Sequence, residues 1–348
     1  MRLKYIDALR GFTMFLVVFW HVMANSFGLG DSSLGAFFKL FRMPMFFFIS
    51  GYIGYKAIDK LNTWKGYISL LKKKAFVQLV PTAIIFSLFK FVHGSSPLVF
   101  FDKGLTGYWF TLSLFELFFI YYTISFVCSI DKGSKLVDFL FVFLICTTWL
   151  AGIYIHHLQD EAPKFCVVFS VGNTLCNMPF FLTGLLFRKH QDRLLNIVTS
   201  QYVFSLFVVL FVVGFFLTQN VFTKDFNLPL FYLLRSFILP FFGIFSVFTV
   251  FYLSREFFDK NGTISRIMQF VGRRTLDIYL IHYFFIIDLS KYKSFFLLEG
   301  GGEFIVGEIV IFGLSAIAII SLCLLISGCL RKSPLLAKYL FGILPKSK

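Results

Sequence analysis

The segment IDALRGFTMFLVVFWHVMANSF, residues 6–27, decides the fold. It has the length of about 20 residues that a helix needs to cross a bilayer. It also contains Asp7, Arg10 and His21, although ionisable groups are costly inside a membrane. Arg10 and His21 are eleven residues apart, so on a helix they share one face and lie about 16 Å apart along the axis. This polar stripe predicts a face turned toward a polar cavity rather than toward lipid.

Two interpretations fit Asp7 and Arg10, whereas His21 is harder to explain structurally. Asp7 and Arg10 are either functional or purely structural, and in the structural case they lie at the membrane surface or pair with each other one turn apart. His21 lies too deep for this, and a histidine at that depth needs a buried partner. Because histidine titrates near neutral pH, His21 suits the role of a general base.

The composition as a whole is that of a membrane protein. Of the 348 residues, 58% are hydrophobic and 53 are phenylalanine, whereas only 15% are charged. A soluble protein could not bury this much apolar surface, so a polytopic membrane protein is predicted. The net charge of +15 lies in short segments between apolar spans, which favours membrane orientation over nucleic-acid binding. The six cysteines lack metal-ligand spacing, so free thiols and no metal site are expected.

The hydropathy pattern predicts an all-α bundle of about ten transmembrane helices. Eleven spans also fit, because the apolar residues 165–173 precede a short sixth span that contains Pro179. The N-terminus resembles a signal peptide but lacks a small-residue cleavage site, so an uncleaved first span is expected. Residues 1–330 are predicted to form one membrane domain, and residues 331–348 a short basic cytoplasmic tail. The predicted spans are residues 6–27, 36–55, 75–92, 108–128, 136–155, 174–187, 197–217, 229–253, 276–290 and 304–329.

The distribution of lysine and arginine predicts the orientation of these spans. With the N-terminus inside, the inner segments hold 23 of these residues and the outer segments hold six. Each inner segment is rich in cations except the small one around Lys132. Because cytoplasmic loops carry the excess of positive charge, both termini are predicted to lie in the cytoplasm. In this orientation Arg10 is near the inner surface and His21 is in the outer half of the first span.

The second and fourth predicted spans add further candidates. Arg42 begins the motif RMPMFFFISGY near the outer end of the second span, where Pro44 can kink the helix. Arg42 is either an interfacial cation or a fixed cation that binds a phosphate, a substrate oxygen or a developing oxyanion. In the fourth span, Trp109 and Glu116 are seven residues apart and share a face. Glu116 either acts in catalysis or forms a structural salt bridge, with Arg42 or with Arg235 of the eighth span.

The segment GRRTLDIYLIHYFF, residues 272–285, opens the ninth predicted span. Arg273 and Arg274 either anchor the span at the inner surface, which the positive-inside rule favours, or bind phosphate. Asp277 and His282 are five residues apart, which is about 140° around a helix, so they are not expected to face each other. The segment nevertheless adds two ionisable side chains to the membrane interior.

Together these motifs resemble those of the acyltransferase family 3 membrane proteins. Tyr5-Ile-Asp-Ala-Leu-Arg-Gly followed by His21 resembles the family's arginine–ten residues–histidine signature. The segment Arg42–Tyr52 resembles its second-span motif, and Tyr108-Trp-Phe with Glu116 downstream resembles its fourth-span motif. The segment Gly272–His282 is similar to its late motif. The four matches run from the first to the ninth span, and the first two are fairly specific in combination.

Such proteins move an acyl group, commonly acetyl, from cytoplasmic acyl-coenzyme A to hydroxyls of cell-envelope or secreted carbohydrates. The resemblance implies an O-acetyltransferase of a bacterial inner membrane with acetyl-CoA as its co-substrate. It implies that His21 and Arg10 form the core catalytic pair, with Arg42 close by. We expect Arg42 to stabilise the oxyanion and Glu116 to orient either a histidine or an arginine. The residues expected to bind substrate are Arg42, Asp7, Trp109, His282 and Arg235, and those expected to bind the donor's phosphates are Arg10, Arg273 and Arg274.

The acceptor is expected to be a glycan or a lipid-linked sugar. The sequence ends soon after its last predicted span and lacks the extracytoplasmic serine-esterase domain of some family members, which makes peptidoglycan a less favoured acceptor. The rival interpretation is a transporter or exporter that uses the same polar stripe without acyl transfer. The lack of an inverted repeat weighs against it, as does the concentration of polar groups in the first, second and fourth spans. A sensor without chemistry is the third interpretation.

Overall fold

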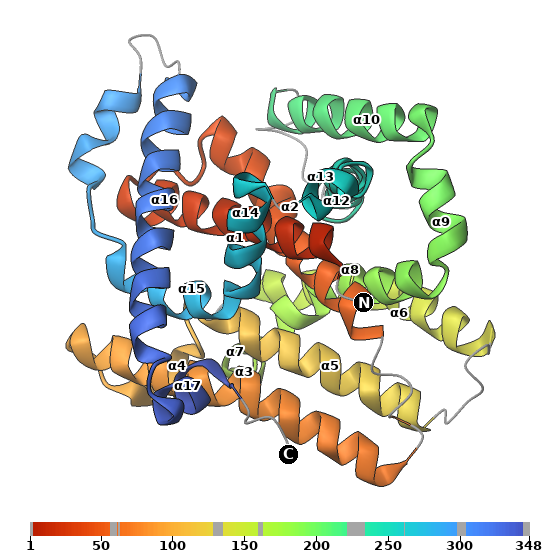
Figure 1. Ribbon diagram of the computed structural model, residues 1–348, viewed down its shortest axis with the longest axis horizontal. Helices are drawn as coiled ribbons and strands as arrows, with labels where there is room; N and C mark the ends of the chain where they lie inside the picture. The colour runs from red at the N-terminus through yellow and green to blue at the C-terminus, as the bar shows by residue number, and fades with distance from the viewer. Residues whose placement is uncertain are drawn as a thin grey trace. The chain divides into compact units, whose positions relative to one another are not determined.

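The computed structural model describes residues 3–55, 61, 63–127, 135–158, 163–220, 234–260, 262–297 and 304–343. These residues form an all-helical protein (Figure 1), as the sequence predicts. Seven helices are long and apolar enough to cross a membrane, and the chain is a multi-pass membrane protein. They are Lys4–Ser26, Ser33–Gly54, Trp64–Val92, Trp109–Val127, Gln201–Thr218, Leu234–Leu253 and Ile305–Leu330.

The fifth and sixth predicted spans fall on helices outside this group of seven. The fifth falls on α6 (Lys135–Leu158), whose described apolar stretch is the shorter Asp138–Tyr154. The sixth falls on α8 (Val171–Lys189). A separate short helix, α7 (Lys164–Val168), precedes α8, and Ser170 separates the two with a φ of 49°. Of the apolar residues 165–173, residues 165–168 therefore lie in a helix of their own, whereas residues 171–173 belong to α8.

The ninth predicted span, residues 276–290, differs most from the structure. Its helix begins earlier, as α14 (Thr263–Arg273), breaks at Arg274 and continues as α15 (Thr275–Ile281). A 3-10 turn, His282–Phe285, follows α15 and ends the helical segment. Polar residues lower the hydropathy of α14, so the sequence pattern concealed its start. In the eighth predicted span, residues 229–233 lie outside the described residues.

The chain divides into two compact units. The first unit comprises residues 1–46 and 191–327, and the second comprises residues 47–190 and 328–348. The boundary falls within α2 (Ser33–Gly54) and α16 (Ile305–Leu330). The other long helices of the first unit are α1 (Lys4–His21), α10 (Gln201–Asn220) and α12 (Leu239–Leu253), and its shorter ones are α9 (Gln191–Val198) and α13 (Arg255–Asp259). The second unit also contains α3 (Trp64–Val92), α4 (Phe100–Lys103), α5 (Trp109–Val127) and α17 (Pro334–Phe341).

In the first unit, α1 packs against α14, and two glycines let the backbones touch (Figure 1). A Cβ atom on Gly11 would collide with the carbonyl oxygen of Met268, and one on Gly272 would collide with the carbonyl oxygen of Asp7. Small residues at such crossings allow close packing of membrane helices. The contact holds α1 beside the segment that carries α15.

Phenylalanine rings attach α16 to the C-terminal end of α1. The ring centre of Phe312 lies 6.1 Å from that of Phe19, 4.9 Å from that of Phe27 and 4.8 Å from that of Phe296. All four rings are buried. Aromatic pairs at these distances add to the free energy gained by burial, so these phenylalanines help to stabilise the core of the first unit.

The second unit is built in a similar way. Here α6 packs against α8, and α3 packs against α5 and α17. A Cβ atom on Gly51 of α2 would collide with the carbonyl oxygen of Phe181, and one on Gly184 of α8 would collide with that of Phe48. Two glycine-mediated crossings, one in each unit, therefore fix neighbouring helices at close range.

Candidate active site

His21 is the last residue of α1, where the helix widens into a single π turn, Val22–Ser26. Such turns often occur at functional sites. The hydroxyl oxygen of Tyr283 lies 3.0 Å from His21 Nε2, and His282 Nε2 lies 3.2 Å from His21 Nδ1. His282 Nδ1 lies 3.0 Å from the carbonyl oxygen of Ile278. A chain of hydrogen bonds therefore connects α1 to the end of α15.

The hydrogen-bond partners of His21 and His282 determine which ring nitrogens carry a proton when both imidazoles are neutral. The Ile278 carbonyl can only accept, so His282 Nδ1 carries a proton and His282 Nε2 a lone pair. That lone pair needs a donor, so His21 Nδ1 carries the ring proton and His21 Nε2 the lone pair. The Tyr283 hydroxyl then donates to His21 Nε2. His21 also hydrogen-bonds the Val17 carbonyl, which likewise requires a proton on this ring.

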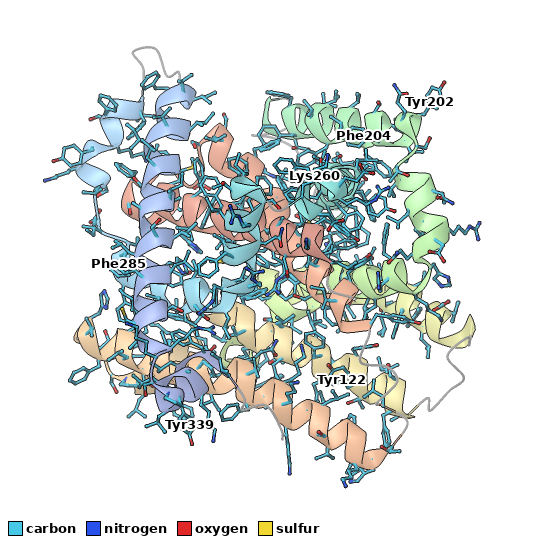
Figure 2. The ribbon with its side chains drawn as sticks, viewed as in Figure 1. Tyr122, Tyr202, Phe204, Lys260, Phe285 and Tyr339 are labelled. Carbon is cyan, nitrogen blue, oxygen red and sulfur yellow. The ribbon has the colours of Figure 1, made fainter. Side chains whose placement is uncertain are left out.

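The three side chains differ in their access to solvent. His282 is fully buried, whereas His21 and Tyr283 are half-buried. The ring centre of Tyr283 lies 4.2 Å from that of His282 and 5.0 Å from that of His21. Phe285, labelled in Figure 2, marks the end of the 3-10 turn that carries His282 and Tyr283. Ring packing and hydrogen bonds together fix this cluster, which we call the His21 cluster (His21, His282 and Tyr283).

Arg42 brings a positive charge to the His21 cluster. Its guanidinium carbon lies 3.7 Å from the centre of the Trp20 ring, and its charge is close enough to interact with His21 and Tyr283. Arg42 is only 7% exposed. Within the described part of the chain, Arg42 Nε and Trp20 Nε1 are buried without a hydrogen-bond partner. Leaving a buried donor unpaired costs free energy, so this arrangement suits a ligand that supplies oxygen acceptors.

Arg10 contacts the same segment of the chain at its other end. Arg10 Nη2 donates to the hydroxyl of Thr275 at 2.7 Å. Next to it, the buried carboxylate of Asp277 accepts a hydrogen bond from Ser327 and lies 3.4 Å from Arg274 Nη1. The stripe of Arg10 and His21 thus faces the α15 segment, with Arg10 at its start and His21 at its end.

Glu116 and Trp109 belong to the second unit. The hydroxyl of Thr174 on α8 donates to Glu116 Oε2 at 2.5 Å. The ring of Trp109 stacks on that of Phe47, with 6.2 Å between the ring centres. Arg42 and Arg235 belong to the first unit, so a salt bridge between Glu116 and either of them stays a prediction.

Three other predicted residues do not take part in the described contacts of the His21 cluster. Asp7 is buried where α1 meets α14, near the N-terminus of α1. Arg235 is half-buried in the π turn Leu234–Ile238, which leads into α12. Arg273 is exposed at the end of α14. Their proposed roles therefore rest on the sequence alone.

Sequence reasoning does not single out Tyr283, Trp20 or Thr275, although each contacts a predicted residue. Tyr283 directly follows His282, and Trp20 directly precedes His21. The available signal in the sequence was that these residues adjoin His282 and His21. Neighbouring side chains on an ideal helix point about 100° apart, so adjacency alone did not predict the contacts. The π turn after His21 and the 3-10 turn at His282 depart from that geometry.

Among the residues that the structure describes, no three His, Cys, Asp or Glu side chains gather as a metal ion would require. The comparison with protein families matches residues 3–328 to the acyltransferase domain of acyltransferase family 3. The match extends over nearly the whole chain and confirms the resemblance inferred from the four motifs. No curated protein and no solved structure matches the chain.

Proposed function

Since the chain belongs to acyltransferase family 3 and is a membrane-bound acyltransferase, we propose that it transfers an acetyl group from cytoplasmic acetyl-CoA to a hydroxyl of a cell-envelope or exported glycan. The observation that carries this proposal is the position of His21. It is a histidine inside a membrane helix, its Nε2 holds a lone pair, and the Arg42 cation lies beside it. Acyl transfer to a hydroxyl needs a base and a stabiliser of negative charge at one place.

His21 is the general base in this proposal. When the acceptor oxygen attacks the thioester carbonyl, Nε2 of His21 takes up the proton that the hydroxyl loses. His282 accepts the hydrogen bond from His21 Nδ1 and so keeps the lone pair at Nε2. His282 is therefore proposed to position His21, whereas the sequence predicts that it binds substrate.

Arg42 stabilises the oxyanion that forms on the thioester carbonyl. Its charge is held on the Trp20 ring, and its guanidinium is almost completely buried. A fixed cation in a site with little water acts strongly on a developing negative charge, because the surroundings need not reorganise. Trp20 is thus proposed to position Arg42.

Arg10 holds the phosphates of the donor at the inner surface. Arg10 and His21 are eleven positions apart on α1, which is about 16 Å along the helix. Thr275 accepts a hydrogen bond from Arg10 and orients the guanidinium, while Arg273 and Arg274 add positive charge. Asp7, Trp109 and Arg235 are proposed to bind substrate, and Glu116 to orient a catalytic group.

The protein is proposed to cross a bacterial inner membrane ten times, with both termini in the cytoplasm. The count of 23 inner and six outer lysines and arginines supports this orientation. It places Arg10 at the side of the cytoplasmic donor and His21 nearer the side of an exported acceptor. A glycan or lipid-linked sugar on the outer side is then the proposed acceptor class.

Transfer of labelled acetyl from acetyl-CoA to membrane glycans tests the function, with wild-type protein compared with His21→Ala. We expect the variant to lose about 100-fold or more of the transfer rate, because general base catalysis contributes that much. His93→Ala is the matched control, since His93 is exposed and hydrogen-bonds the carbonyl of its own helix. Transfer at the wild-type rate in His21→Ala would contradict the mechanism. Wild-type protein that moves a solute but transfers no acetyl would indicate a transporter instead.

A further inference from the structure

Both ring nitrogens of His21 already have partners. Nδ1 donates to His282, and Nε2 accepts from the Tyr283 hydroxyl at 3.0 Å. The lone pair that a general base needs is therefore occupied by a protein proton. An acceptor hydroxyl reaches this lone pair only if Tyr283 moves away or if Tyr283 itself passes the proton on.

The packing around Tyr283 favours the second route. Its ring packs against both imidazoles of the His21 cluster, with its centre 4.2 Å from that of His282 and 5.0 Å from that of His21. It directly follows the fully buried His282 in the same 3-10 turn. Moving the ring aside would disturb both contacts, and a well-packed interior resists such a shift.

Tyr283 is also the accessible end of the hydrogen-bond chain. The chain runs from Tyr283 through His21 and His282 to the backbone carbonyl of Ile278, and His282 is fully buried. Tyr283 is half-buried, and its hydroxyl is close enough to the Arg42 charge to interact with it. His21 is half-buried as well, but its Nε2 is hydrogen-bonded to the phenol, so a substrate hydroxyl reaches that lone pair through Tyr283.

On the basis of the proposed function, we propose that Tyr283 is the catalytic residue that takes the proton of the acceptor hydroxyl and relays it to His21. As the acceptor oxygen bonds to the thioester carbon, its proton moves to the Tyr283 oxygen and the Tyr283 proton moves to His21 Nε2. The Tyr283 phenol is thus neutral before and after the step, and His21 becomes an imidazolium. His282 accepts a hydrogen bond from that imidazolium, which stabilises its charge.

The relay runs in reverse when the product forms. The oxyanion collapses, the carbon–sulfur bond breaks and the thiolate of the donor leaves with the electron pair. The proton on His21 Nε2 returns to Tyr283 while the Tyr283 proton goes to the thiolate. The products are the ester and the free thiol, and the protein ends in its starting protonation state.

The test is Tyr283→Phe in purified, reconstituted protein, with kcat and KM measured for both substrates. The relay predicts that kcat falls by about 100-fold or more while both KM values change little, because only the proton transfer is lost. Tyr252→Phe is the matched control, since Tyr252 is a half-buried tyrosine of α12 whose ring packs against Tyr5 and Phe248 and not against the His21 cluster. This control is expected to keep the wild-type kcat.

A second variant distinguishes proton transfer from a structural role. A fluorinated tyrosine at position 283 keeps the hydroxyl and the ring but has a more acidic phenol. The relay needs the protonated phenol, and this phenol ionises at lower pH, so the alkaline limb of the kcat profile should move to lower pH. An unchanged profile in this variant would overturn the relay.

Two further outcomes would also overturn it. Tyr283→Phe with a kcat within about threefold of wild type would mean that Tyr283 moves aside and His21 acts directly. A labelled acetyl group on Tyr283, found by mass spectrometry after incubation with acetyl-CoA alone, would mean that the phenol is a nucleophile. Both results are distinct from a failure of the proposed function, in which wild-type protein itself transfers no acetyl.

Discussion

Arg42 shows how a positive charge can be kept inside this protein without a carboxylate beside it. Among the described residues, its guanidinium lies on the Trp20 ring and forms no salt bridge. An acidic partner would neutralise the charge before a substrate arrived, whereas an aromatic face stabilises the cation and leaves its charge available. At the scale of single residues, this arrangement favours a ligand that carries or develops negative charge.

Replacement of Arg42 by lysine tests this inference. Lysine keeps the positive charge but lacks the planar guanidinium group that stacks on Trp20. We expect kcat to fall by about 100-fold, the cost of removing one donor from an oxyanion hole, with little change in the KM for acetyl-CoA. Arg266→Lys is the control, because Arg266 is exposed on α14. A rise in KM for the acceptor alone would instead assign Arg42 to acceptor binding.

The sequence predicts part of the site well at this scale, and the reason is helix geometry. Arg10 and His21 lie on a regular α-helix, so their spacing shows that they share a face, and both indeed contact the α15 segment. His282 lies beyond the last residue of α15, in a 3-10 turn. The rotation per residue changes there, so its contact with His21 could not be derived from spacing.

At the scale of helices, the crossing of α1 and α14 controls the site. Gly11 and Gly272 bring the two backbones into contact, and the chain that follows α14 carries Thr275, His282 and Tyr283. A side chain at either glycine must push the helices apart. The hydrogen bonds from α1 to this segment would then lengthen, although neither glycine lies in the His21 cluster.

Replacement of Gly11 by alanine is expected to destabilise the protein and to reduce acetyl transfer. The added methyl group would collide with the Met268 carbonyl oxygen, and overpacking of this kind costs about 1–3 kcal/mol. Gly328→Ala is the control, because a Cβ atom on Gly328 meets nothing within 4 Å and alanine favours the helix more than glycine. Thermal unfolding in detergent should show a lower midpoint for Gly11→Ala only. Equal midpoints for the two variants would show that the crossing tolerates a side chain.

The hydropathy of the sequence revealed neither α14 nor the break between α14 and α15. Hydropathy detects helices that are apolar on most sides, and seven of the predicted spans correspond to such helices. In α14, Ser265 and Gln269 are buried while Ile264 and Ile267 are exposed. Such a helix has its polar side against the protein, and its average hydropathy hides it.

At the scale of the whole molecule, the proposed orientation makes a prediction about surface labelling. Ser95 follows α3 and Lys260, labelled in Figure 2, follows α13; both are exposed. The distribution of positive charge predicts that position 95 is outside and position 260 is in the cytoplasm. In a variant without native cysteines, Ser95→Cys should react with an impermeant maleimide in intact cells. Lys260→Cys should react only after permeabilisation, and the opposite pattern would reverse the orientation.

The number of spans is the feature of the whole molecule that hydropathy leaves open. The pattern predicts about ten, and the described helices include seven that are long and apolar enough to cross a membrane. The difference arises at α6, whose described apolar stretch is Asp138–Tyr154, at α8, which carries polar residues, and at the broken α14–α15 pair. Thr174 lies on α8 and His282 directly follows α15, and both are partners of predicted site residues.

The contact between Gly11 and Gly272 also limits how the protein can move. An axial shift of α1 by one residue is about 1.5 Å and would replace a glycine at the crossing with a bulkier neighbour. The contact therefore opposes sliding of α1 along its axis relative to α14. Arg10 and His21 lie about 16 Å apart along α1, so in the proposed function the reactive end of the donor has to cover that distance itself. A donor with a long flexible arm meets this requirement, whereas a short activated acyl compound does not.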